Sequence, residues 1–136
     1  MAGGAQTVQL TVSTRKQAEV IDVTDRVQQA VSKSAIGTGL CHVYAPHTTA
    51  GVFINENADP DVMDDLLSTL DRLVPWRNQY RHAEGNAAAH IKATLVGTAQ
   101  TVLVQDGRLA LGRWQGIYFA EFDGPRERQI NVTVVP

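Results

Sequence analysis

Hydrophobic and polar positions alternate at the start of the chain. Residues 6–13 carry an aliphatic side chain at every second position, with threonine, glutamine or serine between them. This period of two predicts a half-buried strand. Residues 19–23 can form a second short strand. Thr24 is placed to cap a helix over residues 25–34.

The next two apolar segments lack this alternation. Residues 39–45 and 50–55 carry apolar side chains at both odd and even positions, and the segment 46–49 separates them. Continuous apolar runs are typical of strands that are covered on both faces. We therefore expect both segments to be strands between packed layers.

Two helices are predicted in the middle of the chain. Asp59 is suited to the N-cap of the first helix and Pro60 to its first helical position, and leucines at helical spacing follow. This helix must end before Pro75. Asn86 can cap a second helix over residues 87–96.

The last third of the chain has strand patterns. Residues 101–111 predict a hairpin with its turn at Asp106 and Gly107, and strands over 115–122 and 129–135 follow. Strands outnumber helices and do not alternate with them regularly. This order predicts an α+β fold, a β-sandwich-like arrangement of mixed sheets with two main helices.

Composition limits the classes of protein. The 136 residues are 43% hydrophobic and 19% charged, which is sufficient for one core, so we expect a single domain over 1–136 with residues 1–5 as a flexible tail. The net charge of −2 and the scarcity of clustered lysine and arginine argue against binding to nucleic acid.

The same residues predict a cytoplasmic protein. No signal peptide is visible, and no apolar stretch has the length of a membrane span, so we expect no association with membranes. Cys41 is the single cysteine, which excludes an intrachain disulfide. Its apolar neighbours favour a buried structural thiol over a nucleophile.

Histidines carry the candidate chemistry. His47, His82 and His90 fall in predicted loops or at the ends of elements, among carboxylate and amide side chains. Three neutral imidazoles with an open position suit Zn²⁺, and added carboxylates would favour Mn²⁺ or Mg²⁺. No His-Glu-x-x-His motif is present, so spacing alone is weak evidence for a metal site and favours separate exposed or capping histidines.

Five blocks of sequence resemble a known family, and the resemblance extends from about Leu10 to Val135. The blocks include rare residues and occur at 47–60, 80–86, 89–92, 111–118 and 121–126. Together they resemble the YjbQ family, which is also named for secondary thiamine-phosphate synthase activity. Gly51 and Arg113 depart from the residues that are common in that family.

The resemblance implies an α+β sandwich that assembles as a homotrimer, with sites near the subunit boundaries. It implies that His47, His82 and His90 converge around a divalent metal, Zn²⁺ or Mg²⁺/Mn²⁺. Further candidates for substrate binding or for supporting the metal ligands are then Glu56, Asn57, Glu84, Asn86, Glu121 and Asp123.

The activity that the resemblance implies joins a pyrimidine pyrophosphate to a thiazole phosphate and expels pyrophosphate. Arg126 and Lys92 would hold the phosphate oxygens of this small phosphorylated ligand, and Glu56 or Glu84 would orient a ring nitrogen. Two alternatives stay open. One is a metal-dependent hydrolase or phosphate-transfer enzyme, and the other is a non-catalytic trimer that binds a metal or a small anion.

Overall fold

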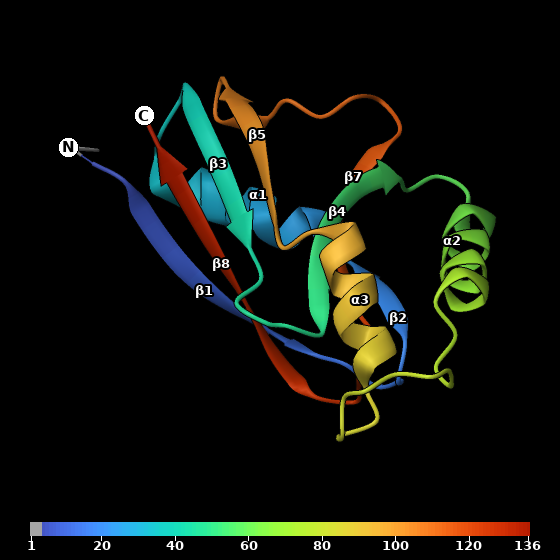
Figure 1. The fold of residues 1–136 in the computed structure, drawn as a ribbon. Coiled ribbons are helices and arrows are strands. Elements are labelled where there is room, and N and C mark those ends of the chain that lie inside the picture. The colour runs from blue at the N-terminus through green and yellow to red at the C-terminus, as the bar shows by residue number, and fades with distance from the viewer. Residues whose placement is uncertain (1–3) are drawn as a thin grey trace.

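The structure is a computed structural model that describes residues 4–136 (Figure 1). Of the tail expected over 1–5, residues 1–3 lie outside the described part. The elements in chain order are β1 (Gln6–Ser13), β2 (Glu19–Asp22), α1 (Thr24–Ser34), β3 (Gly39–Tyr44), β4 (Ala50–Glu56), α2 (Pro60–Leu73), α3 (Ala87–Val96), β5 (Ala99–Gln105), β6 (Arg108–Leu109), β7 (Gln115–Glu121) and β8 (Glu127–Val135).

The strands form two sheets. A five-stranded sheet has the order β1-β8-β3-β5-β6, and a three-stranded sheet has the order β2-β7-β4. The α+β class is confirmed. One detail differs from the expectation: every strand pair among the described residues is antiparallel rather than mixed. The helix expected over residues 25–34 is present as α1, in addition to the two main helices α2 and α3.

The main core lies between the two sheets and includes α1. Val27 and Val31 of α1 are fully buried against the inner face of the large sheet, where strand residues such as Val132 lie. Val52 and Phe119 of the small sheet face the same core. Burial of this aliphatic surface is the principal stabilisation of the arrangement.

A second core lies on the opposite face of the small sheet. Phe53 of β4 stacks on Tyr118 of β7 with ring centroids 5.2 Å apart, and Met63 of α2 and Ala89 of α3 pack beside them. Figure 1 shows α3 running beside β4, with α2 farther out. β4 is therefore covered on both faces, as its sequence predicts.

The same prediction is wrong for β3. Cys41 and Val43 point into the main core, whereas Leu40, His42 and Tyr44 lie on an exposed outer face of the large sheet. The apolar side chains of Leu40 and Tyr44 had suggested two covered faces, but no element of the described chain covers this one. Burial of Cys41 is confirmed, and it raises the pKa of the thiol to about 11.

Helix starts follow the sequence, but only one of the three predicted caps forms as expected. Asp59 caps α2 and accepts a hydrogen bond from the backbone N–H of Asp61 at 2.9 Å, as predicted. Thr24 is not a cap, because α1 already begins there and Val23 is its N-cap residue. The hydroxyl of Thr24 bonds instead to Asp22 and to the backbone N–H of Ile117.

The hairpin turn also follows the sequence. Asp106 and Gly107 both have positive φ, at 52° and 73°, as a tight two-residue hairpin turn requires. Among residues 4–136, no helix is long and apolar enough to cross a membrane.

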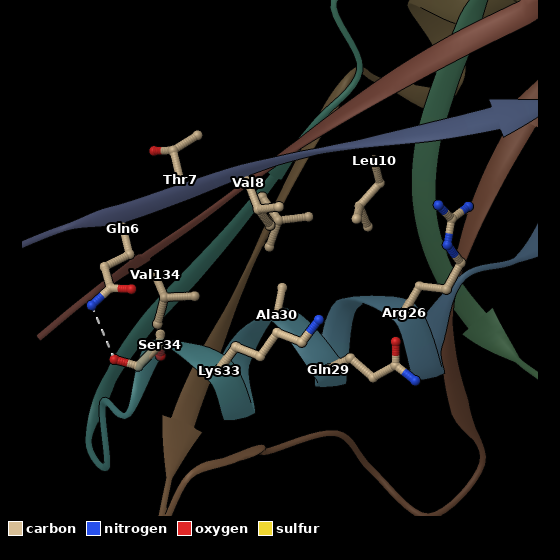
Figure 2. A pocket seen from close by; sticks show the side chains of 11 residues that line it. Gln6, Thr7, Val8, Leu10, Arg26, Gln29, Ala30, Lys33, Ser34 and Val134 are labelled. Carbon is tan, nitrogen blue, oxygen red and sulfur yellow. Dashed lines mark hydrogen bonds between the residues drawn. The ribbon is translucent and has the colours of Figure 1, made fainter.

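A small hollow of about 180 Å³ lies between β1 and α1 (Figure 2). Aliphatic side chains such as Val8, Leu10 and Ala30 line it, together with Arg26 and Lys33, and Gln6 donates a hydrogen bond to the carbonyl of Ser34 across its end. Histidine and carboxylate side chains are absent from its lining. It is a gap at the edge of the core, and the candidate chemistry lies elsewhere.

Candidate functional site

The connection from β3 to β4 positions the first histidine. The backbone N–H of Ala45 donates to the carbonyl of Thr98 at 2.8 Å, and the N–H of His47 donates back to Ala45 at 2.9 Å. These bonds hold the connection against the segment that links α3 to β5. The His47 ring lies edge-on to Phe119, with centroids 6.4 Å apart.

The other two histidines come from α3 and the loop before it. The rings of His82 and His90 are nearly perpendicular, with centroids 5.2 Å apart. Nε2 of His82 is 4.0 Å from Oε2 of Glu84, whose side chain is 76% exposed. The two imidazoles therefore lie beside each other with a carboxylate at the solvent side.

All three histidines line one open hollow of about 640 Å³, which we call the histidine hollow. The β3–β4 connection, the loop before α3, and the segment from the end of β7 into β8 provide most of its walls. Its lining residues are Tyr44, Pro46, His47, Thr48, Thr49, His82, Glu84, Asn86, His90, Asp123, Arg126 and Arg128.

A buried ion pair supports one wall of this hollow. Arg128 donates through Nε and Nη2 to both carboxylate oxygens of Glu121, and through Nη2 to the Thr49 hydroxyl at 2.8 Å. Glu121 also accepts the hydroxyl of Thr14 and the backbone N–H of Asp123. These bonds satisfy the buried carboxylate and fix the direction of the guanidinium.

A second polar chain crosses the mouth of the hollow. Oδ2 of Asp123 accepts from Nδ2 of Asn86 at 2.9 Å and from Nη2 of Arg126 at 3.1 Å. Oδ1 of Asn86 is buried and has no hydrogen-bond partner among the described residues. Asn86 is the N-cap residue of α3 by position, but its side chain joins the loop to the β7–β8 turn instead of capping the helix.

One nitrogen of His47 is already in use. The backbone N–H of Gln129 donates to Nε2 at 2.9 Å. The carbonyl of Gln129 is 3.2 Å from the same nitrogen, but the amide hydrogen is fixed in position, so Nε2 acts as the acceptor and the neutral ring carries its proton on Nδ1. Burial and the nearby Arg128 charge lower the pKa of His47 below its ordinary value.

Formal charges in the lining cancel. Arg126 and Arg128 contribute two positive charges, and Glu84 and Asp123 contribute two negative charges when the histidines are neutral. The hollow can therefore take an anion at its arginine side and a cation at its histidine side. A ligand that carries both charges, such as a phosphate bound to a metal ion, can pair with the arginines and the histidines at the same time.

Three predicted site residues lie away from the histidine hollow. Glu56 is the last residue of β4 and Asn57 follows it, so Glu56 lies roughly 23 Å along the strand from Thr49 at about 3.3 Å per residue. Lys92 is buried on α3, and its Nζ lies 3.2 Å from Oδ1 of Asp71 on α2. Lys92 thus joins the two helices.

Glu121 lies behind the hollow rather than in it. Its side chain is fully buried, and its oxygens are taken up by Thr14, Asp123 and Arg128. Its effect on a ligand passes through Arg128. The remaining predicted residues, which do line the hollow, are His47, His82, Glu84, Asn86, His90, Asp123 and Arg126.

The donor set fits a metal ion in part. His82 and His90 are adjacent, and Glu84 is near, whereas Nε2 of His47 accepts the Gln129 amide. Within residues 4–136, no three histidine, cysteine, aspartate or glutamate side chains are grouped closely enough to hold an ion as placed. His82 and His90 are thus the adjacent pair of candidate ligands, and Nε2 of His47 would first have to release its backbone bond.

Arg128 and Thr49 are the residues that sequence reasoning missed. A signal for Arg128 was present, because Arg128, Ile130, Val132 and Val134 alternate on the inward face of β8. A cation at a core-facing strand position requires a buried partner. The equally buried Glu121 on β7 is that partner.

These features define a class: an α+β protein of two antiparallel sheets and three helices, with a mixed-charge histidine and arginine hollow beside one helix. Residues 8–136 match the model of a family described as UPF0047 protein YjbQ-like. The chain belongs to this UPF0047, or YjbQ-like, family.

The chain is similar to curated relatives over nearly its full length. The chain is 52% identical over 120 residues to the UPF0047 protein YugU of Bacillus subtilis, covering 88% of this chain and 91% of the relative. It is 48% identical over 124 residues to the UPF0047 protein MJ1081 of Methanocaldococcus jannaschii, covering 91% and 90%.

Solved structures show the same fold. An uncharacterized conserved protein of the family from Clostridium acetobutylicum superposes with a TM-score of 0.93 at 48% identity, covering 94% of this chain and 99% of that one. A protein of unknown function from Sulfolobus solfataricus has a TM-score of 0.93 at 36% identity, covering 96% of each chain.

Proposed function

We propose that this protein is an enzyme with thiamine-phosphate synthase activity, which acts on phosphorylated small molecules in the histidine hollow. The observation that supports it most is the convergence of three histidines with Arg126 and Arg128 on one hollow. In the proposed reaction the thiazole nitrogen forms a bond to the methylene carbon of the pyrimidine. The carbon–oxygen bond to pyrophosphate breaks, and pyrophosphate leaves with the electron pair.

The arginines would bind phosphate oxygens of both substrates, including those of the pyrophosphate that leaves. Arg128 is held through Nε and Nη2, and Arg126 through Nε and Nη2, so each guanidinium has its Nη1 hydrogens left for a ligand. Among the described residues, neither Nη1 group donates to a protein acceptor. Donors that are already oriented stabilise developing charge without reorganisation.

His47 and Glu84 have complementary parts in this proposal. A neutral His47 that carries its proton on Nδ1 can donate that hydrogen to a phosphate oxygen. Glu84 is exposed at the mouth and can accept from a ring N–H or amino group of the pyrimidine. Asn86 adds an unpartnered Oδ1 acceptor beside Asp123.

A divalent cation, Zn²⁺ or Mg²⁺/Mn²⁺, is part of the proposal. His82 and His90 would be its first ligands, and His47 would join them by releasing the amide of Gln129. When bound, such a cation supplies Lewis-acid charge that offsets a phosphate. The cancelling charges of the lining favour this view, because the side chains alone have no positive excess for a phosphate dianion.

We also propose a homotrimer. Leu40, Tyr44 and Leu103 are between 41% and 45% exposed on the outer face of the large sheet. An exposed apolar surface of this kind commonly marks an interface. Tyr44 also lines the histidine hollow, so a neighbouring subunit on this face would border the site. We place the reaction in the cytosol.

The test is a direct assay with both substrates. Purified protein with added Mn²⁺ or Zn²⁺ is incubated with the pyrimidine pyrophosphate and the thiazole phosphate, and thiamine phosphate and released pyrophosphate are measured together. We expect thiamine phosphate and pyrophosphate to appear in equal amounts. Arg126→Gln and His82→Ala should lower turnover at least tenfold, whereas the control Arg108→Gln, at an exposed arginine of β6 outside the hollow, should not change it.

Other outcomes identify the alternatives. If no thiamine phosphate forms and phosphate esters are hydrolysed by the wild type but not by His82→Ala, the protein is a hydrolase or phosphate-transfer enzyme. If ligands bind without any turnover, it is a metal-binding or anion-binding protein. Either result would reject the synthase.

A further inference from the structure

A second hollow adjoins the first. It measures about 340 Å³ and lies where α3 meets the start of β5. We call it the threonine hollow, and its lining residues are His47, Thr48, His90, Ala93, Thr94 and Thr98. Because His47, Thr48 and His90 line both hollows, the two spaces adjoin at these three residues.

The threonine hollow differs from the histidine hollow in chemistry. None of its lining side chains is an aspartate, glutamate, lysine or arginine. The hydroxyl of Thr94 donates to the carbonyl of His90 at 2.9 Å, one turn back on its own helix, which leaves the methyl group as the free part of the side chain. Together with the methyl of Ala93, it makes this space weakly polar and uncharged.

This pairing of spaces points to a ligand in two parts. We propose that the site binds a phosphate ester whose anionic group lies in the histidine hollow and whose uncharged part, the size of a single ring, lies in the threonine hollow. The junction between the two parts would then lie beside His47 and His90. A cavity of about 150 Å³ already holds benzene, so the threonine hollow has room for a five- or six-membered ring with a substituent.

The inference rests on the proposed function, which places an anion in the histidine hollow. It adds which of the two substrates the paired hollows would bind. Of the two substrates of the proposed synthesis, the thiazole phosphate has this form: an uncharged ring joined by a short chain to a phosphate. The described residues supply arginines on the histidine side only. We therefore assign the threonine hollow to the ring and not to a second phosphate.

The test compares inorganic phosphate with phenyl phosphate by titration calorimetry, with the protein as purified and again with added Mn²⁺. The wild type should bind phenyl phosphate about tenfold more tightly, because the ring leaves water. Thr94→Leu narrows the threonine hollow from an exposed helical position that tolerates leucine. It should abolish this tenfold advantage and change the affinity for inorganic phosphate less than twofold.

Two further variants separate the hollows. Thr69→Leu places the same substitution on an exposed site of α2, outside both hollows, and should leave both affinities at the wild-type values. Arg126→Gln should weaken both ligands by a similar factor, because it acts on the phosphate that they share. Circular dichroism confirms that each variant is folded.

The outcomes distinguish this inference from the proposed function. The two-part site is rejected, and the anion site stands, if phosphate binds but phenyl phosphate binds no more tightly. The same holds if Thr94→Leu keeps the higher affinity for phenyl phosphate. If neither ligand binds under either condition, the anion site and this inference both fail. If thiamine phosphate does not form, but phenyl phosphate binds more tightly than phosphate and Thr94→Leu removes this difference, the two-part site stands and the synthase is rejected.

Discussion

Glu121 and Arg128 form a buried ion pair across β7 and β8, directly behind the histidine hollow. The Glu121 side chain is fully buried and that of Arg128 is 6% exposed, and both carboxylate oxygens accept from the guanidinium. The pair therefore has two effects: it stabilises the packing of the two sheets only while both charges are present, and it directs Arg128 toward the ligand.

Glu121→Gln tests the first of these effects. The substitution leaves the Arg128 charge buried without its counterion, which costs roughly 3–5 kcal/mol of the free energy of unfolding. Urea unfolding followed by circular dichroism measures this loss. Glu127→Gln, at an exposed position of β8, is the control and should change stability by less than about 0.5 kcal/mol. A loss below about 1 kcal/mol for Glu121→Gln would contradict the structural role of the pair.

Much of the fold follows from the local pattern of the sequence. Asp59 and Pro60 mark the start of α2, and Asp106 with Gly107 marks a turn, because these residue types satisfy particular backbone requirements by themselves. The exposed face of β3 could not be predicted in this way. Its apolar residues resemble those of a covered strand, and only the arrangement of the elements shows that nothing in the described chain packs on them.

Site residues in loops could be predicted from the sequence. Residues on strands and helices, such as Glu56 and Lys92, could be predicted less well. His47 and Glu56 belong to the same block of family resemblance, 47–60, but β4 carries the chain the length of the sheet between them. Lys92 is only two residues beyond His90, yet two residues turn a helix by about 200°, which directs the lysine toward α2. Strand length and helix phase thus separate side chains that the linear sequence groups together.

The pH dependence of stability should reflect His47. Its pKa is lowered from the ordinary value of 6.5 by burial first and by Arg128 second, so below about pH 6.5 the unfolded chain binds a proton that the folded protein does not. The free energy of unfolding therefore falls as the pH drops below that value, until the folded pKa is passed. Chemical unfolding between pH 7 and pH 5 measures the slope, and His47→Gln should reduce it.

A nuclear magnetic resonance titration provides the direct check on His47. Its imidazole should titrate below pH 6.5 and show the nitrogen shifts of a neutral ring protonated on Nδ1 at pH 7. A midpoint at or above 6.5 would overturn both the pKa shift and the stability prediction.

The proposed trimer can be tested on the outer face of the large sheet. Leu40 and Leu103 are paired across β3 and β5 and are 45% and 43% exposed. Leu103→Lys places a charge on this face and should shift the mass in solution from three times 14.8 kDa toward a single chain. Light scattering after size exclusion measures the mass. Leu73→Lys, at a residue 71% exposed at the end of α2, should leave it unchanged, and a wild-type monomer would reject the assembly.

Metal binding is tested by metal content and by the amide of Gln129. We expect one equivalent of divalent metal per chain by mass spectrometry, and loss of that metal on chelation or in His47→Ala, His82→Ala and His90→Ala.

Arg108→Gln alters an exposed side chain outside the hollow and should retain the ion. For His47 to become a ligand through Nε2 it must release the N–H of Gln129, so metal addition should move that amide resonance. If the metal binds while the Gln129 resonance stays in place and His47→Ala retains the ion, His82 and His90 hold it without His47. In that event His47 keeps Nδ1 as a hydrogen-bond donor, and its role in the hollow is to contact the substrate.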